Sequence, residues 1–399
     1  MLKKLPLNAN ELALLVAIVV VVLLAGYFDE YHNYWADPWS SVRDIARHTA
    51  LLGIFSLGAA VVIISGGIDL SSGSMIAFSG TICATIMLLL APEEMATAQP
   101  LGIGVVCVAI GGTLLVGFLV GSLHAWLITV VGLPPFIATL ASLVGLRSLG
   151  RVVCENVTAV TPGLGKSSQI QVFDEQFRYL ATSVWIPVVL FIVLSFAVWI
   201  LLSKTVVGRH IYALGGNEEA ARLSGIRTEK IKWLAYCIGT LTATIAGILY
   251  VCDQSVADPQ TLGRAYELNA IAAAVVGGCS LQGGVGTVLG TVLGALFLRT
   301  VIDGIAKIIK SGADVYEGLI VGIVVVVAVA LSTFRERVRL GREVFPGGLG
   351  VVSLFTLVVG VGVLATLMAG SKAGIVAAVV ALVVLGFVRF LEVRRRHVV

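Results

Sequence analysis

Apolar runs, most of them close to the length of a membrane-spanning helix, alternate along this chain with short polar segments. A helix needs about 20 consecutive apolar residues to cross the hydrocarbon core of a bilayer. Hydrophobic residues make up 58% of the chain and charged residues only 13%, so a water-soluble fold would lack polar side chains to cover its surface. The sequence therefore predicts an all-α polytopic membrane protein. The runs are 12–28, 49–68, 73–90, 101–123, 134–149, 183–202, 232–252, 268–281, 285–302, 316–333, 349–369 and 374–391.

These runs divide the chain into three parts. We expect an N-terminal anchor helix with a polar segment (1–48), a transmembrane domain (49–337) and a basic loop followed by an additional hairpin (338–399). The fold would have about ten core transmembrane helices with broken Gly-rich segments, plus the C-terminal two-helix extension. The run 268–281 is short for an ordinary span, and the sequence leaves open whether it spans or is re-entrant.

The basic residues indicate which side each loop faces. If Lys3 and Lys4 lie inside, alternation of the runs places 203–232, 334–348 and the C-terminal tail on the same side. More than half of the 27 Lys and Arg residues then lie inside, as the positive-inside rule requires. We expect a multi-pass protein of the cell (inner) membrane with both termini cytoplasmic. The net charge of +4 gives no support for nucleic-acid binding.

Chemistry-bearing motifs are scarce. The six Cys and five His residues are dispersed, without CxxC pairs or metal-ligand spacing. The segment GLGKS (163–167) lacks the first glycine of a Walker A loop, because that position is Val160. GGVGTVLG (283–290) lacks GxGxxG spacing. We therefore expect no metal, no cofactor and no catalytic site in this chain.

An internal echo joins two glycine-rich stretches. Residues 65–73 are SGGIDLSSG and residues 276–284 are VGGCSLQGG. They align at an offset of 211, and each joins two apolar runs. Paired Gly-interrupted segments indicate a translocation pathway with a parallel repeat, although glycine-rich membrane sequence also aligns with itself by chance. The candidate hinges are Gly66, Gly67, Gly73, Gly277 and Gly278.

The inside loop 203–232 contains a short helix by its capping pattern. Gly215 and Gly216 break the chain, Asn217 caps the helix, and acidic residues fill its first turn. Gly225 ends it in a left-handed conformation. The loop is either a docking surface for another protein or only a solvated segment. The candidate residues that follow the cap are Glu218, Glu219, Ala220, Ala221, Arg222, Leu223, Ser224 and Ile226.

Asp69 lies at a break between two runs, where an ionisable group is costly unless it is paired or hydrated. It either lines a pathway with Ser71 and Ser72, or accepts the free amides of these serines as a helix cap, and we favour the cap. Glu267 and Asn269 form either a polar mouth or a simple helix start.

Four segments resemble known permeases. Loop residues 212–226 (YALGGNEEAARLSGI) resemble the coupling-helix loop of ABC importer permeases, and GGIDLSSGS (66–74) resembles the signature of the ribose, xylose and galactose permease family. LPPFIATLASL (133–143) and the stretch 266–296 agree further, in the family's order. These motifs add Phe136, Thr139 and Gln282 to the pathway candidates.

The resemblance implies a permease subunit that forms the path for a monosaccharide or similar polar small molecule. Its partners would be a second copy or close paralogue, two cytoplasmic ABC ATPase subunits that hydrolyse the ATP, and an extracytoplasmic sugar-binding protein. Residues 217–226 would dock on the ATPase. The alternative is an ion-coupled secondary transporter of a small polar solute, which would need embedded ionisable groups. The candidates for those are Asp69, Arg147, Glu267, Arg299 and Asp303.

The chain departs from the family in two places. Family members usually end soon after the segment that matches 316–337, whereas this chain continues into the hairpin. Cys279 stands where a threonine is common.

Overall fold

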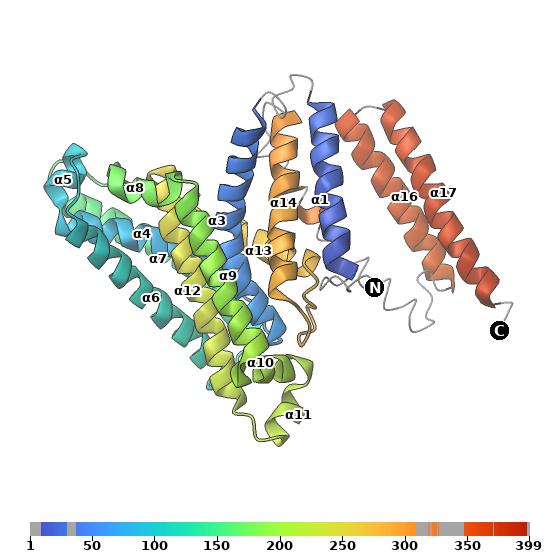
Figure 1. The fold of residues 1–399 in the computed structure, drawn as a ribbon, viewed down its shortest axis with the longest axis horizontal. Coiled ribbons are helices and arrows are strands. Elements are labelled where there is room, and N and C mark those ends of the chain that lie inside the picture. Colours follow the sequence, from blue (N-terminus) through green and yellow to red (C-terminus); the bar gives the residue numbers. More distant parts are fainter. Residues whose placement is uncertain are drawn as a thin grey trace, which may run out of the picture. The chain divides into compact units, whose positions relative to one another are not determined.

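A computed structural model describes residues 9–29, 37–308, 318–319, 321–324, 326, 347–369 and 371–396. The chain forms two compact units, 1–325 and 326–399. Figure 1 shows that helices dominate both. Two short strands, β1 (Ile170–Gln171) and β2 (Val256–Ala257), pair antiparallel with Ile170 opposite Ala257. The prediction of an all-α polytopic membrane protein is confirmed.

Eight helices within the described residues are long and apolar enough to cross a membrane. The predicted run 316–333 and the loop after it lie largely outside the described residues. The eight helices are α1 (Ala9–Phe28), α3 (Pro38–Ile64), α4 (Ser72–Leu90), α6 (Ile103–Thr129), α7 (Pro135–Val160), α9 (Trp185–Lys204), α12 (Thr228–Gln254) and α14 (Val288–Ile308).

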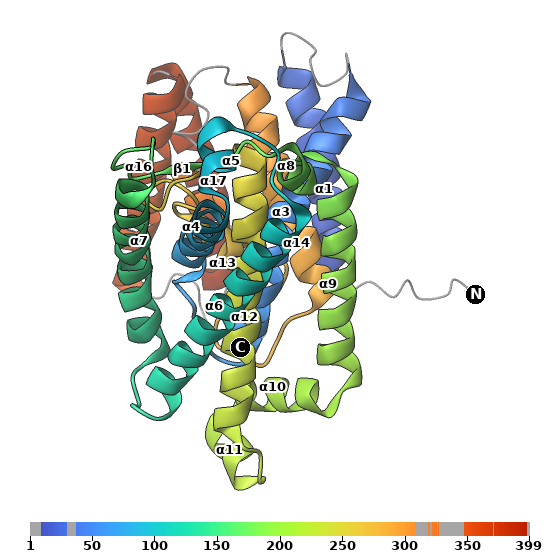
Figure 2. The ribbon, with the colours of Figure 1, turned by 90° about the vertical axis from the view of Figure 1, so that its left-hand side faces the viewer.

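Short helices mark the two ends of the first unit. α5 (Pro92–Thr97) and α8 (Glu175–Thr182) lie at one end, called here the α8 end, as Figure 2 shows. α10 (Val206–Gly216) and α11 (Glu218–Leu223) lie at the opposite end, called the α11 end. α13 (Tyr266–Val276) is a short helix that packs antiparallel against α14, with Gly277 beside Gly290.

The core consists of α3, α4 and α12. Between 78% and 89% of the apolar windows of these helices is buried, against 22% or less for α6, α7 and α9. Small residues permit close approach: Gly58 of α3 faces Gly239 and the Thr242 hydroxyl of α12. The outer helices therefore present apolar side chains to the membrane or to another protein.

The start of α3 differs from the predicted span. The helix begins at Pro38 rather than Thr49, because Asp37 caps it and proline suits the first turn. The amide of Ser40 donates to Asp37 Oδ1 at 3.0 Å. Part of the predicted polar N-terminal segment is thus helical. α1 also belongs to the first unit, where it packs along α14.

The second unit contains the predicted C-terminal hairpin. α16 (Gly347–Ala369) and α17 (Ser371–Arg396) pack against each other. Gly362 lies beside Ala378, and Gly374 lies beside Thr366. Small residues therefore set the close approach of these two helices.

Candidate functional site

α3 ends in a glycine-dependent turn. The amide of Gly66 donates to the carbonyl of Ile63 at 2.9 Å, and the amide of Gly67 donates to that of Val62 at 3.0 Å. Gly66 has φ +84°, a left-handed backbone conformation that residues other than glycine rarely adopt. The chain leaves the helix there and enters the first glycine-rich loop, residues 65–71.

α13 ends in the same way. The amides of Gly278 and Cys279 donate to the carbonyls of Val275 and Ala274, both at 2.9 Å. Gly278 has φ +97°, whereas Gly277 has φ −65° and still belongs to the helical turn. The structural equivalent of Gly66 is therefore Gly278, and the sequence alignment at offset 211 is wrong by one residue. The second glycine-rich loop comprises residues 277–287.

The two loops meet at the α11 end. The amide of Gly284 donates to the carbonyl of Ile64 at 2.9 Å. A methyl group on Gly283 would press on the Cα of Gly66. Both loops thus face the same end of the bundle, which is the arrangement expected of a parallel repeat.

α10 contacts both loops through its backbone. A Cβ on Gly215 would overlap the carbonyl of Ile64 and the amide of Gly284. Gly215 and Gly216 do not break the helix as predicted, because α10 continues through both of them. The close approach of α10 to the loops requires a residue without a side chain at position 215. By contrast, a Cβ on Gly216 would meet nothing within 4 Å.

Tyr212 adds a side-chain contact that the sequence analysis missed. Its hydroxyl donates to the carbonyl of Gly286 at 2.8 Å. Burial raises the pKa of Tyr212 further above neutral pH, where a tyrosine hydroxyl already carries its proton. The sequence signal for this contact is the spacing of three residues between Tyr212 and Gly215, which puts both on one face of a helix.

The local structure of α11 follows its capping pattern. The amide of Ala220 donates to Asn217 Oδ1 at 2.9 Å. At the other end, Gly225 has φ +84° and the amide of Ile226 donates to the carbonyl of Ala221 at 3.1 Å. The predicted cap and stop are both present.

The outer face of α11 is open to contact. Leu223 is 79% exposed on this six-residue helix. Glu218 forms an ion pair with Lys232 at 2.6 Å, which fastens α11 to the start of α12. Ser224 and Gly225 are exposed, whereas Ala221 is buried. The other exposed candidate residues of α11 are Glu218, Glu219, Ala220 and Arg222.

Asp69 is buried and engaged locally. Its Oδ1 accepts from the amide of Ser71 at 2.7 Å and from the Ser71 hydroxyl at 2.5 Å. The bond to the Ser71 amide agrees with the cap interpretation in part, but the N-cap residue of α4 is Ser71 itself and no side chain caps the helix there. Ser72 is also buried, and Gly73 lies against the carboxylate of Glu267. The starts of α4 and α13 therefore meet inside the bundle.

The other pathway candidates separate. Thr139 is buried, and its hydroxyl lies 3.4 Å from the carbonyl of Ile68, within the first loop. Phe136 and Gln282 are exposed, and the structure does not bring them to this polar group. Asn269 faces a different polar cavity, together with Arg299 and with His48, which the sequence analysis missed.

Arg147 anchors a loop. Its guanidinium donates to the carbonyls of Leu262 at 2.9 Å and Gly263 at 2.8 Å. A third bond, to the carbonyl of Pro259, measures 3.2 Å. The side chain thus fixes the segment between β2 and α13.

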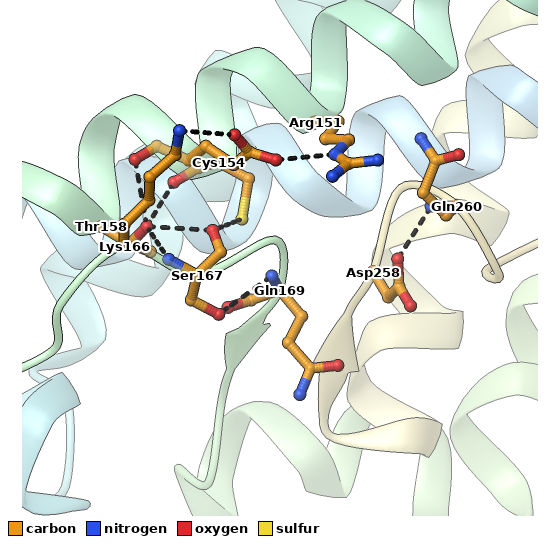
Figure 3. Close-up of polar contacts among 9 residues, drawn as sticks. Arg151, Cys154, Thr158, Lys166, Ser167, Gln169, Asp258 and Gln260 are labelled. Atoms are coloured by element: carbon orange, nitrogen blue, oxygen red, sulfur yellow. Dashed lines mark hydrogen bonds and ion pairs between the residues drawn. The ribbon is translucent and has the colours of Figure 1, made fainter.

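The GLGKS segment lies in the loop after α7, at the α8 end. Figure 3 shows Lys166 and Ser167 beside the last turns of α7. Lys166 forms an ion pair with Glu155 at 3.1 Å, and the Ser167 amide donates to Thr158 Oγ1 at 2.9 Å. The segment leads into β1 rather than a helix, as expected of a sequence that is not a phosphate-binding loop.

Comparison with known proteins identifies the family of this chain. Residues 41–329 match the family model described as branched-chain amino acid transport system / permease component. The chain belongs to this permease family. The match ends before the hairpin of α16 and α17, so the hairpin lies outside the shared region.

The relatives cover most of the permease. This chain is 36% identical over 327 residues to the ribose import permease protein of Escherichia coli strain K12, and the match covers 82% of this chain and 93% of that protein. Identity to the ribose import permease protein of Bacillus subtilis strain 168 is 33% over 321 residues, 80% of this chain and 91% of that protein. Identity to the xylose transport system permease protein of E. coli strain K12 is 28% over 386 residues, 83% of this chain and 93% of that protein. No solved structure matches the chain. The resemblance found in the motifs is confirmed.

Proposed function

We propose that this permease is the membrane-spanning subunit of an ATP-driven importer for a monosaccharide or similar polar small molecule. The names of its ribose and xylose relatives support the substrate class. The observation that carries the proposal is the backbone contact of Gly215 with both glycine-rich loops. This contact connects α10 to the two loops. α10 leads directly to α11, an exposed helix to which a motor protein can bind.

The proposed assembly has the α11 end in the cytoplasm. Two ABC ATPase subunits dock there, a second copy or a close paralogue of this chain completes the pathway, and an extracytoplasmic sugar-binding protein delivers the solute. Glu11, at the start of α1, accepts from the Thr287 hydroxyl at 3.0 Å, so the start of α1 lies near the second loop at the α11 end. This contact supports a cytoplasmic N-terminus. The basic C-terminal tail supports a cytoplasmic C-terminus by the positive-inside rule. The positive-inside rule supports the same orientation through Lys204, Arg209, Arg222, Arg227, Lys230 and Lys232.

Coupling follows from the contacts of α10. ATP binding closes the ATPase subunits and displaces α11. α10 transmits this displacement, because a backbone contact at Gly215 has no flexible side chain to absorb it. The turns at Gly66 and Gly278 take up the change in backbone angle, and the pathway opens alternately to each side.

Two of the five embedded charges, Arg147 and Asp69, give the ion-coupled alternative less support. Arg147 is bonded to backbone carbonyls. Asp69 is bonded to Ser71. Groups already engaged in this way gain less from binding a transported ion. Asp303 Oδ2 lies 3.8 Å from Lys307. This atom, Glu267 Oε2 and Arg299 Nε are buried without a hydrogen-bond partner among the described residues, so these three groups do not count against ion coupling.

The test is uptake of radiolabelled D-ribose and D-xylose by cells that produce the complete transport system. Deletion of Glu218–Arg222 is expected to abolish uptake and co-purification of the ATPase, while the permease stays in the membrane fraction. The matched control deletes residues 93–97, which include the paired glutamates of α5 at the opposite end, and is expected to keep ATPase co-purification.

Two results would contradict the proposal. One is ordinary uptake after deletion of Glu218–Arg222. The other is uptake that survives ATP depletion and stops when an ionophore collapses the ion gradient, which is the behaviour of a secondary transporter.

A further inference from the structure

A polar cavity of about 190 Å³ lies between α3, α12, α13 and α14. One water molecule occupies about 30 Å³ in the liquid, so the cavity has room for a small solute rather than a single water. Seven of its lining residues carry polar side chains that a ligand can contact: His48, Tyr250, Asp253, Gln254, Tyr266, Asn269 and Arg299.

The cavity runs inward from the α8 end. Gln254, the last residue of α12, is exposed at its rim. Tyr250 and Asn269 are each only 8% exposed and form its inner part. An ion pair between Arg47 and Asp253 connects α3 to α12 beside the rim. The walls are therefore held together independently of any ligand.

One wall is aromatic and rigid. The rings of Tyr250 and Tyr266 lie with centroids 5.0 Å apart. Phe55 stacks on Tyr266 with centroids 6.1 Å apart and an interplanar angle of 5°, which restrains the tyrosine ring. The rings of Tyr250 and Tyr266 are tilted by 54° to each other, so the wall offers apolar ring carbons at an angle to the C–H groups of a ligand.

The lining also includes hydrogen-bond donors. Arg299 Nε is buried and has no hydrogen-bond partner among the described residues. A buried donor without a partner costs free energy that a ligand oxygen would recover. His48 and Asn269 also line the cavity, and the amide of Asn269 is both a donor and an acceptor.

We propose that this cavity binds one monosaccharide-sized polyol. This assignment rests on the proposed function and adds a binding site to it. A sugar ring places its C–H groups against the tyrosine rings and its hydroxyl groups toward Arg299, His48 and Asn269. An amino acid would need a free carboxylate for its ammonium group. Asp253, the carboxylate among the described lining residues, is already paired with Arg47.

The cavity is joined to the glycine-rich loops by α13. Asn269 lies in the first turns of this helix, and Gly278 lies two residues past its last residue, Val276. The 11 residues of α13 extend about 16 Å. A displacement of the second loop by α10 therefore moves a wall of the sugar site through one short rigid element.

The test fills the cavity without touching the coupling contacts. Ile302→Phe places a larger apolar side chain at the cavity wall. The matched control, Ile192→Phe, makes the same change on the exposed face of α9, where Ile192 is 59% exposed. The readouts are uptake of D-ribose and D-xylose and basal ATP hydrolysis by the purified complete transporter. We expect Ile302→Phe to lower uptake at least tenfold with unchanged basal ATP hydrolysis, and Ile192→Phe to change neither.

A second variant covers a failure of Ile302→Phe to fold. Arg299→Gln removes the charged donor at similar size and is expected to raise the KM for uptake at least tenfold. Arg299→Lys is expected to restore part of this loss, and membrane levels of both are checked. Wild-type uptake in variants that assemble normally overturns the sugar site and leaves the importer proposal intact. A wild-type transporter that imports neither sugar overturns the sugar class itself, and the site with it.

Discussion

The amide of Gly284 donates a hydrogen bond of 2.9 Å to the carbonyl of Ile64, and Gly215 of α10 packs against both groups. This single junction brings together the end of α3, the second glycine-rich loop and the segment that leads to α11. Each of its contacts gives a testable consequence.

Gly215→Ala is expected to impair transport because its methyl group meets backbone atoms, which cannot move aside as a flexible side chain can. Overpacking of this kind costs about 1 to 3 kcal/mol. A methyl group added to the adjacent Gly216 would meet nothing within 4 Å, so Gly216→Ala is the matched control. Uptake and thermal unfolding in detergent are measured together. Equal uptake by both variants would show that the close approach at Gly215 is not needed for coupling.

Tyr212→Phe removes the donor to the Gly286 carbonyl and leaves the ring in place. The expected loss of stability is about 1 kcal/mol. We expect the maximal uptake rate to fall while KM stays unchanged, since the contact lies at the α11 end and not in the polar cavity. Tyr179→Phe on the exposed face of α8 serves as the control. A change in KM with an unchanged maximal rate would contradict the assignment of Tyr212 to coupling.

Asp69→Asn and Asp69→Ala separate the two roles considered for this residue. Asparagine keeps an oxygen that accepts from Ser71, whereas alanine loses it at a cost of about 1 to 2 kcal/mol. If Asp69 caps α4, the asparagine variant retains uptake and the alanine variant loses stability. If the carboxylate carries a proton or cation during transport, both variants lose uptake. Uptake assays at acidic and neutral pH, together with thermal unfolding, distinguish these results.

Leu223→Asp tests the outer face of α11. Because Leu223 is 79% exposed, the substitution is expected to change the free energy of unfolding by no more than about 0.5 kcal/mol. We expect it to abolish co-purification of the ATPase and, with it, uptake. Leu164→Asp, on an exposed loop at the α8 end, is the control. Normal co-purification would exclude this face of α11 as the docking surface.

Local patterns in the sequence predicted local structure well. The cap at Asn217 and the bond from Ser71 to Asp69 depend on residues two or three positions apart, so short spacing was enough to predict them. The long apolar runs likewise predicted the helices, because membrane thickness sets their length. The start of α3 was missed because its first turns are polar, and only the cap at Asp37 marks them.

Contacts between distant segments were not predictable in this way. The one-residue error in the repeat arose because Gly277 and Gly278 are identical as letters and differ only in backbone conformation. Likewise, His48 and Arg299 come together in one cavity only through the packing of α3 against α14. A lone histidine or arginine in an apolar run carries no sign of such a neighbour.

The junction of Gly284, Ile64 and Gly215 is built from main-chain atoms and from the absence of side chains. Its geometry does not depend on which side chains surround the polar cavity at the other end of α13. Substitutions that change the lining of the cavity leave this backbone junction unchanged, so under the proposed mechanism substrate preference and energy coupling can evolve separately.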